Sequence, residues 1–221
     1  MALNLCFLYT WRMSTVRPLR QDAARNRERL VLAAREVFRR KGLEAPLEEI
    51  AREAGVAIGT LYNRFPARDE LIDAALEPLA ERAVELADRA AGDEDPWRAF
   101  ESFIVGTCEL VAADRGYADF YRSRVPGAPV IAATRRRLGE IKKTVMARAM
   151  SAGVLRTDIE QADVVFLIWG TAAIMDATRA SAPDAWRRHL ALQLDGLRPA
   201  AAHPLPAPPL TLPELRDASP R

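Results

Sequence analysis

The chain has 221 residues, of which 49% are hydrophobic and 28% charged, and its formal net charge is +2. This length suits one large domain or two small ones, and the composition excludes a disordered or collagen-like chain. No apolar run approaches the ~18 residues that a membrane span needs. The two cysteines, Cys6 and Cys108, are too few for a disulfide scaffold, so we expect no membrane association and a reduced, cytoplasmic location.

The net charge hides an uneven distribution. Residues 17–68 contain 12 Lys and Arg against 7 Asp and Glu, a local net charge of +5. Residues 69–221 contain 19 basic and 23 acidic residues, a net charge of −4. A basic segment on an acidic body indicates a surface that faces an anionic polymer, although a solvated helix face would have the same composition.

Both ends of the chain look unlike a folded core. Residues 1–11 form an apolar run without the positive residues that begin a secretory signal, and Met13 looks like a more ordinary start. We therefore expect residues 1–20 to be a disordered or mis-assigned leader, with translation beginning at Met13. Residues 198–221 contain seven prolines, which block helix formation and predict a flexible tail.

Between these ends, apolar residues recur with helical spacing. Turn-forming residues separate the periodic segments, and no segment alternates apolar and polar residues as a strand would. The sequence therefore predicts an all-α fold with about nine helices, expected near residues 30–42, 47–54, 57–64, 69–84, 96–113, 116–124, 130–152, 159–179 and 183–197.

Residues 46–65 have the layout of a helix-turn-helix motif. Two short helices flank Gly55, which can take a positive φ at the turn, and Val56 and Leu61 would pack the second helix onto the first. A face of the second helix is then left free for the major groove of DNA, which admits an α-helix. An ordinary corner between two helices remains an alternative on spacing alone.

The run LEEIAREAGVAIGTLYNRFPARDELIDAAL, residues 47–76, resembles the signature of the TetR family of bacterial transcriptional regulators. Matching elements are Ile50-Ala51, Ala54-Gly55-Val56, Gly59-Thr60-Leu61-Tyr62, Phe65 and Glu70-Leu71. Three residues depart from the family pattern. Arg64 and Arg68 stand where histidine and lysine are frequent, although both arginines remain donors, and Ala45 replaces the Thr or Ser that usually caps the second helix. The resemblance implies a DNA-binding domain at 21–68 and a helical domain for effector binding and dimerisation at 69–197.

The resemblance also implies roles for individual residues. Tyr62 and Arg68 would contact phosphates, and Ile58, Thr60, Asn63 and Arg64 would contact base edges, with Gly59 allowing the backbone to approach. Arg20, Arg25 and Arg27 would strengthen the positive field. The implied partner is a palindromic double-stranded DNA operator bound by a homodimer, because one motif reads few base pairs.

The resemblance further implies a small-molecule effector, which we expect to be mainly apolar. Its candidate pocket residues are aromatic, apolar or weakly polar side chains: Trp97, Phe100, Phe103, Ile104, Thr107, Cys108, Phe120, Tyr121, Phe166 and Trp169. For the dimer interface we expect the last two helices, including Val164, Val165, Leu167, Ile168, Ala172, Ile174, Met175, Trp186, Leu190, Leu194 and Leu197. Gly170 and Ala173 would let two helices approach closely.

Two other classes of function were weighed. A helical enzyme would need a catalytic motif, and the sequence has no nucleophile elbow, zinc-protease motif or phosphate-binding glycine loop. We therefore expect no catalysis, no cofactor and no metal site, and Cys108 to be a buried apolar residue. The second alternative is an effector-binding helical protein that does not bind DNA. The sequence favours a ligand-responsive repressor, without excluding activation.

Overall fold

The computed structural model describes residues 16–122, 128–211 and 213–215, and the side chains from residue 22 on. It contains nine α-helices and one 3₁₀ turn in these ranges, and no strand. The expected all-α fold is confirmed. The helices are α1 (Val16–Lys41), α2 (Leu47–Glu53), α3 (Ile58–Arg64), α4 (Arg68–Ala91), α5 (Pro96–Ala113), α6 (Arg115–Arg122), α7 (Pro129–Ser151), α8 (Gln161–Thr178) and α9 (Ala185–Gly196), followed by η1 (Pro199–Ala201).

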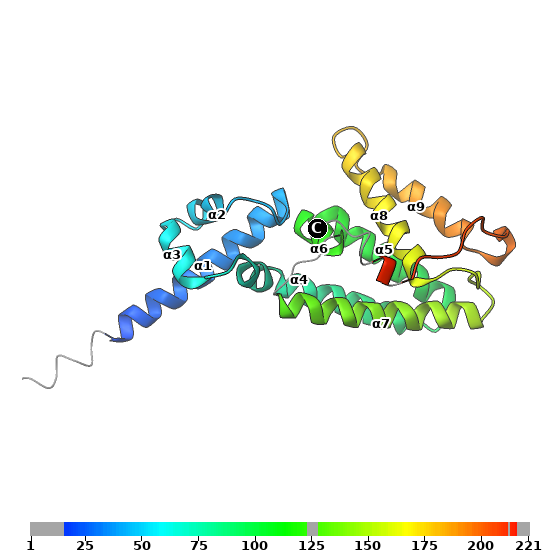
Figure 1. Cartoon of the computed structure of the whole chain (residues 1–221), viewed down its shortest axis with the longest axis horizontal. Coiled ribbons are helices and arrows are strands. Elements are labelled where there is room, and N and C mark those ends of the chain that lie inside the picture. Colours follow the sequence, from blue (N-terminus) through cyan, green and yellow to red (C-terminus); the bar gives the residue numbers. More distant parts are fainter. Residues whose placement is uncertain (1–15, 123–127, 212, 216–221) are drawn as a thin grey trace, which may run out of the picture.

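The first three helices form a head at one end of an elongated molecule (Figure 1). The buried face of α1 includes Leu30, Val37 and Phe38, and it packs against Ile50 of α2 and Leu61 of α3. Gly55 turns the chain between α2 and α3 with φ +64°, a conformation that side chains with a Cβ rarely adopt. The head therefore has the geometry that the spacing of residues 46–65 predicts.

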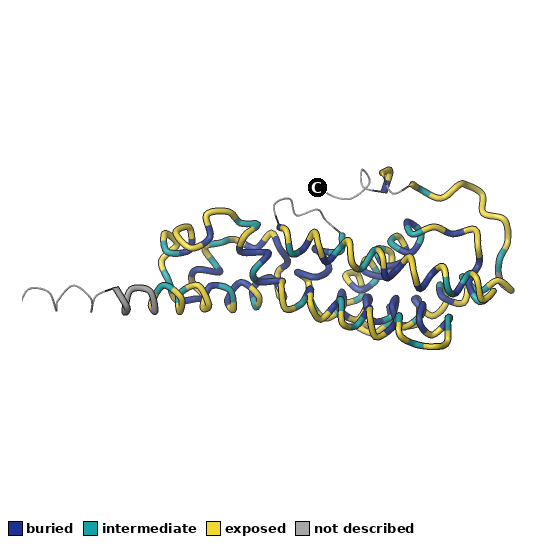
Figure 2. Tube along the Cα trace, turned by 90° about the horizontal axis from the view of Figure 1, so that it is seen from below, coloured by how far each residue is buried: buried dark blue, intermediate teal, exposed yellow. Residues whose placement is uncertain are grey.

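The body is built on α4, α5 and α7, and α8 and α9 pair beside them (Figure 1). Its buried residues lie along the inward sides of the helices, and exposed residues follow the outer sides (Figure 2). Asp95 accepts hydrogen bonds from the backbone N–H groups of Trp97 and Arg98 at 2.9 and 3.0 Å, which begins α5 where the sequence predicts. No helix among the described residues is long and apolar enough to cross a membrane.

The head joins the body through α4 and through contacts between α1 and α6. A carboxylate oxygen of Asp119 on α6 accepts a 2.9 Å hydrogen bond from the backbone N–H of Leu43, which follows α1. Gly42 makes this approach possible, because a Cβ at that position would overlap the same oxygen. The buried carboxylate of Asp73 on α4 accepts hydrogen bonds from the N–H groups of Val130 and Ile131, both 3.0 Å long, and so caps α7.

The starts of two helices and the proline-rich tail differ from what the sequence predicts. α1 begins at Val16, inside the range expected to be a leader, and residues 1–15 of that range lie outside the described part of the chain. α4 begins at Arg68 without a side-chain cap, one residue before the start that the sequence predicts. Part of the proline-rich segment is anchored, since Arg156 donates a 2.8 Å hydrogen bond to the carbonyl of His203.

Candidate nucleic-acid interface and ligand cavity

The outer face of α3 is open to solvent. Leu61 is fully buried and fixes the rotation of this helix, so that the residues before and after it point outward. Tyr62 is 49% exposed and Ile58 is 37% exposed, so both large side chains on this face are open to another molecule. Asn63 and Arg64 are exposed, and Thr60 is half-buried. Together with Gly59, six of the seven residues expected to contact DNA are thus accessible on α3.

Gly59 lies on this surface, and the packing of the chain does not explain it. A Cβ added to Gly59 would have no atom within 4 Å, whereas one added to Gly55 would lie 2.7 Å from a nitrogen of Arg29. Glycine at position 55 is therefore required by the fold. Glycine at position 59 leaves the start of α3 without a side chain, so another molecule could approach the backbone closely.

Arg68 is placed differently from what the sequence analysis expects. Its guanidinium donates to the backbone carbonyls of Leu43 and Ala45, the second at 2.6 Å, and its Nε is buried without a partner in the described ranges. These bonds engage Arg68 with the loop before α2. In this structure Arg68 holds that loop through its Nη2 group.

Arginines surround the exposed face of α3. Arg27 lies over the ring of Phe65, with its guanidinium carbon 5.2 Å from the centroid, and Arg29 donates to the carbonyl of Gly55 at 3.4 Å. Arg25 and Arg64 are exposed and form no ion pair with the described residues. The local charge is therefore positive, as the distribution of charge along the sequence predicts.

A cavity of about 150 Å³, partly open to solvent, lies in the body between α5, α6, α7 and α8. Four of the ten expected pocket residues line it: Phe103, Thr107, Phe120 and Tyr121. Trp97, Phe100, Ile104 and Cys108 are buried in the core around α5 instead. Phe166 is 37% exposed and packs edge-on against Trp169, so these two rings lie towards the outside of α8.

Sequence reasoning missed the polar part of this cavity. Its other lining residues are Arg135, Leu138, Gly139, Lys142 and Val165. Lys142 is only 7% exposed, and burial lowers its pKa from 10.5 to about 8. A signal was present in the sequence, because Lys142 falls within the apolar set Ile141, Val145 and Ala149 on one side of α7.

Cys108 is fully buried, and burial raises the pKa of its thiol to about 12. A thiol in that state is a small apolar side chain rather than a nucleophile, as the sequence analysis expects. Groups of three or more His, Cys, Asp or Glu side chains with metal-binding geometry do not occur in the described ranges.

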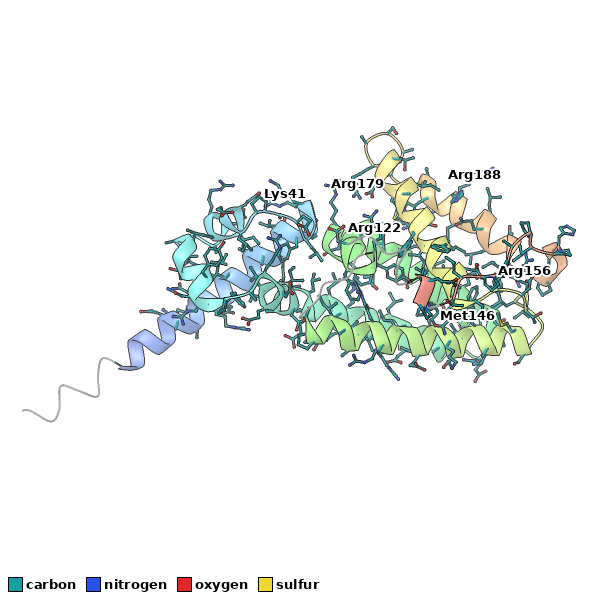
Figure 3. All side chains as sticks on the ribbon, in the orientation of Figure 1. Lys41, Arg122, Met146, Arg156, Arg179 and Arg188 are labelled. Carbon is teal, nitrogen blue, oxygen red and sulfur yellow. The ribbon has the colours of Figure 1, made fainter. Side chains whose placement is uncertain are left out.

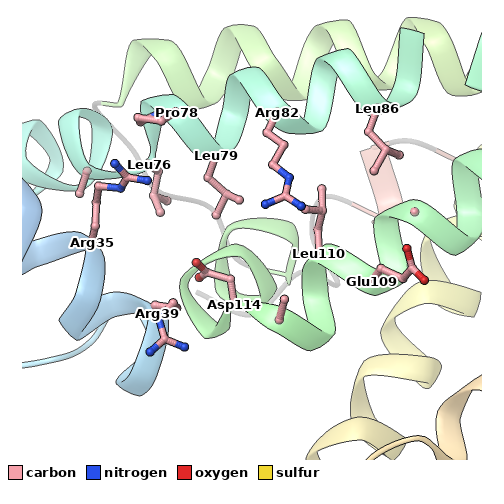
Figure 4. A pocket seen from close by; sticks show the side chains of 13 residues that line it. Arg35, Arg39, Leu76, Pro78, Leu79, Arg82, Leu86, Glu109, Leu110 and Asp114 are labelled. Atoms are coloured by element: carbon pink, nitrogen blue, oxygen red, sulfur yellow. The ribbon is translucent and has the colours of Figure 1, made fainter. Parts of the chain in front are cut away.

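A larger cleft of about 450 Å³ lies where the head meets the body, between α1, α4 and α5 (Figure 4). Arg35 and Arg39 of α1 face Arg82 of α4 and Asp114, which follows α5, across this space (Figure 4). Burial raises the pKa of Asp114, although hydrogen bonds from backbone N–H groups and the nearby Arg39 and Arg35 oppose this. The cleft separates the head from much of α5. The head therefore contacts the body mainly through α4 and α6.

Comparison with known proteins covers both parts of the molecule. The model of bacterial regulatory proteins of the tetR family matches residues 30–75, and the model of the C-terminal domain of SbtR-like transcriptional regulators matches residues 95–199. The chain belongs to the TetR family. The resemblance of residues 47–76 is thereby confirmed, and the second match extends it to the body of this TetR-family chain.

The chain is also similar to individual regulators. A TetR transcriptional regulator from Streptomyces coelicolor is 34% identical, with 79% of this chain and 99% of that chain covered and a TM-score of 0.49. FadR from Bacillus subtilis, solved with stearoyl-CoA, has the same fold at 16% identity, with coverages of 80% and 99% and a TM-score of 0.61. The HTH-type transcriptional regulator YvdT of Bacillus subtilis is 37% identical over 79 residues, 35% of this chain and 41% of that protein. The present chain thus aligns with about two fifths of the length of this curated relative.

Proposed function

We propose that the chain is a cytoplasmic repressor without catalytic activity, which binds a palindromic DNA operator as a homodimer and is released by a small molecule. The observation that carries this proposal is the exposed face of α3, where Ile58 and Tyr62 stand beside the unpaired Arg64. A major groove of DNA would accept this helix, and the surrounding arginines supply the charge that phosphates attract.

Within this interface, each residue has a separate task. Tyr62 would hold a phosphate and fix the register, whereas Ile58, Thr60, Asn63 and Arg64 would contact base edges and provide selectivity. Gly59 would allow the start of α3 to lie close to the DNA. Because Arg68 already bonds to Leu43 and Ala45, we assign it the positioning of α2 rather than a phosphate contact.

The proposed dimer uses the outer side of α8 and α9. Most of the residues expected at the interface, such as Ile168 and Trp186, are buried within the single chain and belong to its own core. An exposed stripe with helical spacing remains on α8, formed by Phe166, Gly170, Ala173 and Ala177. Leu192 is 60% exposed on α9, the helix that packs against α8. We propose that this stripe packs against the same stripe of a second copy in a twofold dimer.

Helix α6 connects the cavity with the head and with the proposed dimer helices. Phe120 and Tyr121 of α6 line the cavity, and Asp119 bonds to the head at Leu43. Arg122 forms a 3.1 Å ion pair with Asp176 on α8, and Arg179 shares that carboxylate at 2.9 Å. Figure 3 shows Arg122 on α6 close to Arg179 at the end of α8. A ligand that displaces α6 would therefore change the position of the head.

Release requires that the effector bind more tightly to the conformation that does not fit the operator. The coupling is reciprocal, so operator DNA must weaken effector binding by the same factor. Both affinities can be measured separately.

The test uses the DNA upstream of the gene and the full chain, with footprinting and fluorescence anisotropy. Tyr62→Ala should weaken binding to all sequences by a similar factor, and Asn63→Ala should change which bases are preferred. Arg136→Ala, an exposed arginine on α7, is the matched control and should leave affinity unchanged. If the wild-type chain protects no upstream DNA, the chain is instead an effector-binding protein without DNA binding, and the proposal fails.

A further inference from the structure

Lys142 lines the cavity, and an apolar ligand would offer its ammonium group no hydrogen-bond acceptor. It lies on α7, and its side chain is more than nine-tenths buried. Its ammonium group donates one hydrogen bond, 3.2 Å long, to the backbone carbonyl of Gln161 at the start of α8. Because an ammonium group has three N–H donors, two of them are left for another acceptor.

The charge of Lys142 is also uncompensated. No carboxylate of the described residues pairs with it, and the pKa of Lys142 is lowered by burial alone. Arg135, the other cation of the lining, donates to the carbonyl of Phe120 and stacks over its ring at 5.0 Å. The polar end of the cavity is thus positive, and buried charges are ordinarily paired.

The rest of the lining is mostly apolar and aromatic. Phe103, Phe120, Leu138 and Val165 supply it, and the hydroxyl of Tyr121 makes no hydrogen bond to the described residues. A cavity of ~150 Å³ is the size that accommodates one benzene ring in a protein interior. The enclosed part of this half-open pocket therefore fits a single ring with one or two small substituents.

We propose that the cavity binds a single-ring aromatic carboxylate, with its carboxylate on the ammonium group of Lys142 and its ring between Phe103 and Phe120. This inference rests on the proposed function only in assigning an effector to the cavity. It replaces the expected mainly apolar effector by an anionic one.

A purely structural role for Lys142 makes a different prediction. If the lysine served only to tie α7 to α8 through Gln161, the wild-type chain would bind a carboxylate and an amide equally well, and Lys142→Met would destabilise the fold. If it is an anion receptor, Lys142→Met removes an unpaired buried charge, so the empty protein keeps or gains stability. This variant would also lose the preference of the wild-type chain for a carboxylate over an amide.

The experiment is calorimetric titration of the full chain, without DNA, with benzoate and with its neutral counterpart benzamide. The wild-type chain should bind benzoate at least about tenfold more tightly than benzamide, as expected for a hydrogen bond to a charged group. Lys142→Met should reduce this ratio to about one, whereas Lys143→Met, an exposed lysine on the same helix, should retain it. Gly139→Leu should abolish binding of both ligands by filling the cavity, since a Cβ there meets no atom within 4 Å.

Equal affinities for the two ligands, a preference that survives Lys142→Met, or no benzoate binding at millimolar concentration would each overturn the inference. Circular dichroism of every variant confirms that it is folded. Because the titration contains no DNA, its result is independent of whether the chain binds an operator. Benzoate that binds in the cavity but leaves operator affinity unchanged would support the anion site and contradict its role in release.

Discussion

Asp73 provides a direct test of how α7 is held against α4 within the body. This carboxylate on α4 is 8% exposed, and its two oxygens accept hydrogen bonds from Val130 and Ile131 at the start of α7. The backbone of α7 has no other side-chain cap at this end. Asp73→Ala would leave both N–H groups without an acceptor while the helix remains packed.

The size of the effect follows from those two bonds. A hydrogen bond to a charged group contributes about 1.5–3 kcal/mol, and loss of a helix cap costs about 0.5–2 kcal/mol. Water in the cleft beside Asp73 would satisfy part of this demand, because the residue lines a space of about 400 Å³. We expect the free energy of unfolding to fall by about 3 kcal/mol, equivalent to roughly 6–12 °C in Tm for a chain of this size.

Urea denaturation at a fixed protein concentration measures this difference. Glu77→Ala, an exposed residue one turn further along α4, is the control and should change stability by less than about 0.5 kcal/mol. Asp73→Asn retains one acceptor oxygen and should lose about half as much as Asp73→Ala. A change in Asp73→Ala no larger than that of the control would refute the capping role.

Three further outcomes are expected. Gly42→Ala should destabilise the fold by at least about 1–2 kcal/mol, measured by urea denaturation, because its φ is +85° and the new Cβ would overlap the carboxylate of Asp119; an unchanged midpoint would contradict this. The stability of wild type relative to Lys142→Met should rise between pH 8 and 10.5, by up to about 3 kcal/mol, since the unfolded lysine then binds more protons than the folded one; a flat difference would exclude the lowered pKa. Ala173→Asp should convert the dimer to a monomer in sedimentation, whereas Ala147→Asp, at an exposed position of α7, should not; the same oligomeric state in both variants would place the interface elsewhere.

Helical periodicity predicted the fold well because each helix buries one side and its ends carry turn-forming residues. Helix α5 illustrates this, since Asp95 and Pro96 begin it as the sequence indicates. The start of α4 was misplaced because Arg68 is drawn to the carbonyls of Leu43 and Ala45, a tertiary contact that no local pattern contains.

The two functional regions differ in how much the sequence reveals. The exposed surface of α3 can be predicted from Leu61, because the burial of this residue orients all the other residues of the helix. The polar lining of the cavity cannot be predicted in this way, because a lysine is ordinarily assigned to the surface, whereas Lys142 is buried. For α8, whose residues are apolar on nearly all sides, the pattern cannot tell which face meets its own core, and Ile168 therefore turned out to be buried while Phe166 is exposed.

The central claim is that the positive surface around α3 binds DNA. The most direct test is the salt dependence of the affinity of the full chain for a palindrome from the upstream region, measured by anisotropy between about 50 and 200 mM salt. Our account predicts that the logarithm of the binding constant falls linearly with the logarithm of salt concentration, by about 0.9 for each phosphate contacted. A slope of zero, or no binding at the lowest salt concentration, would contradict it.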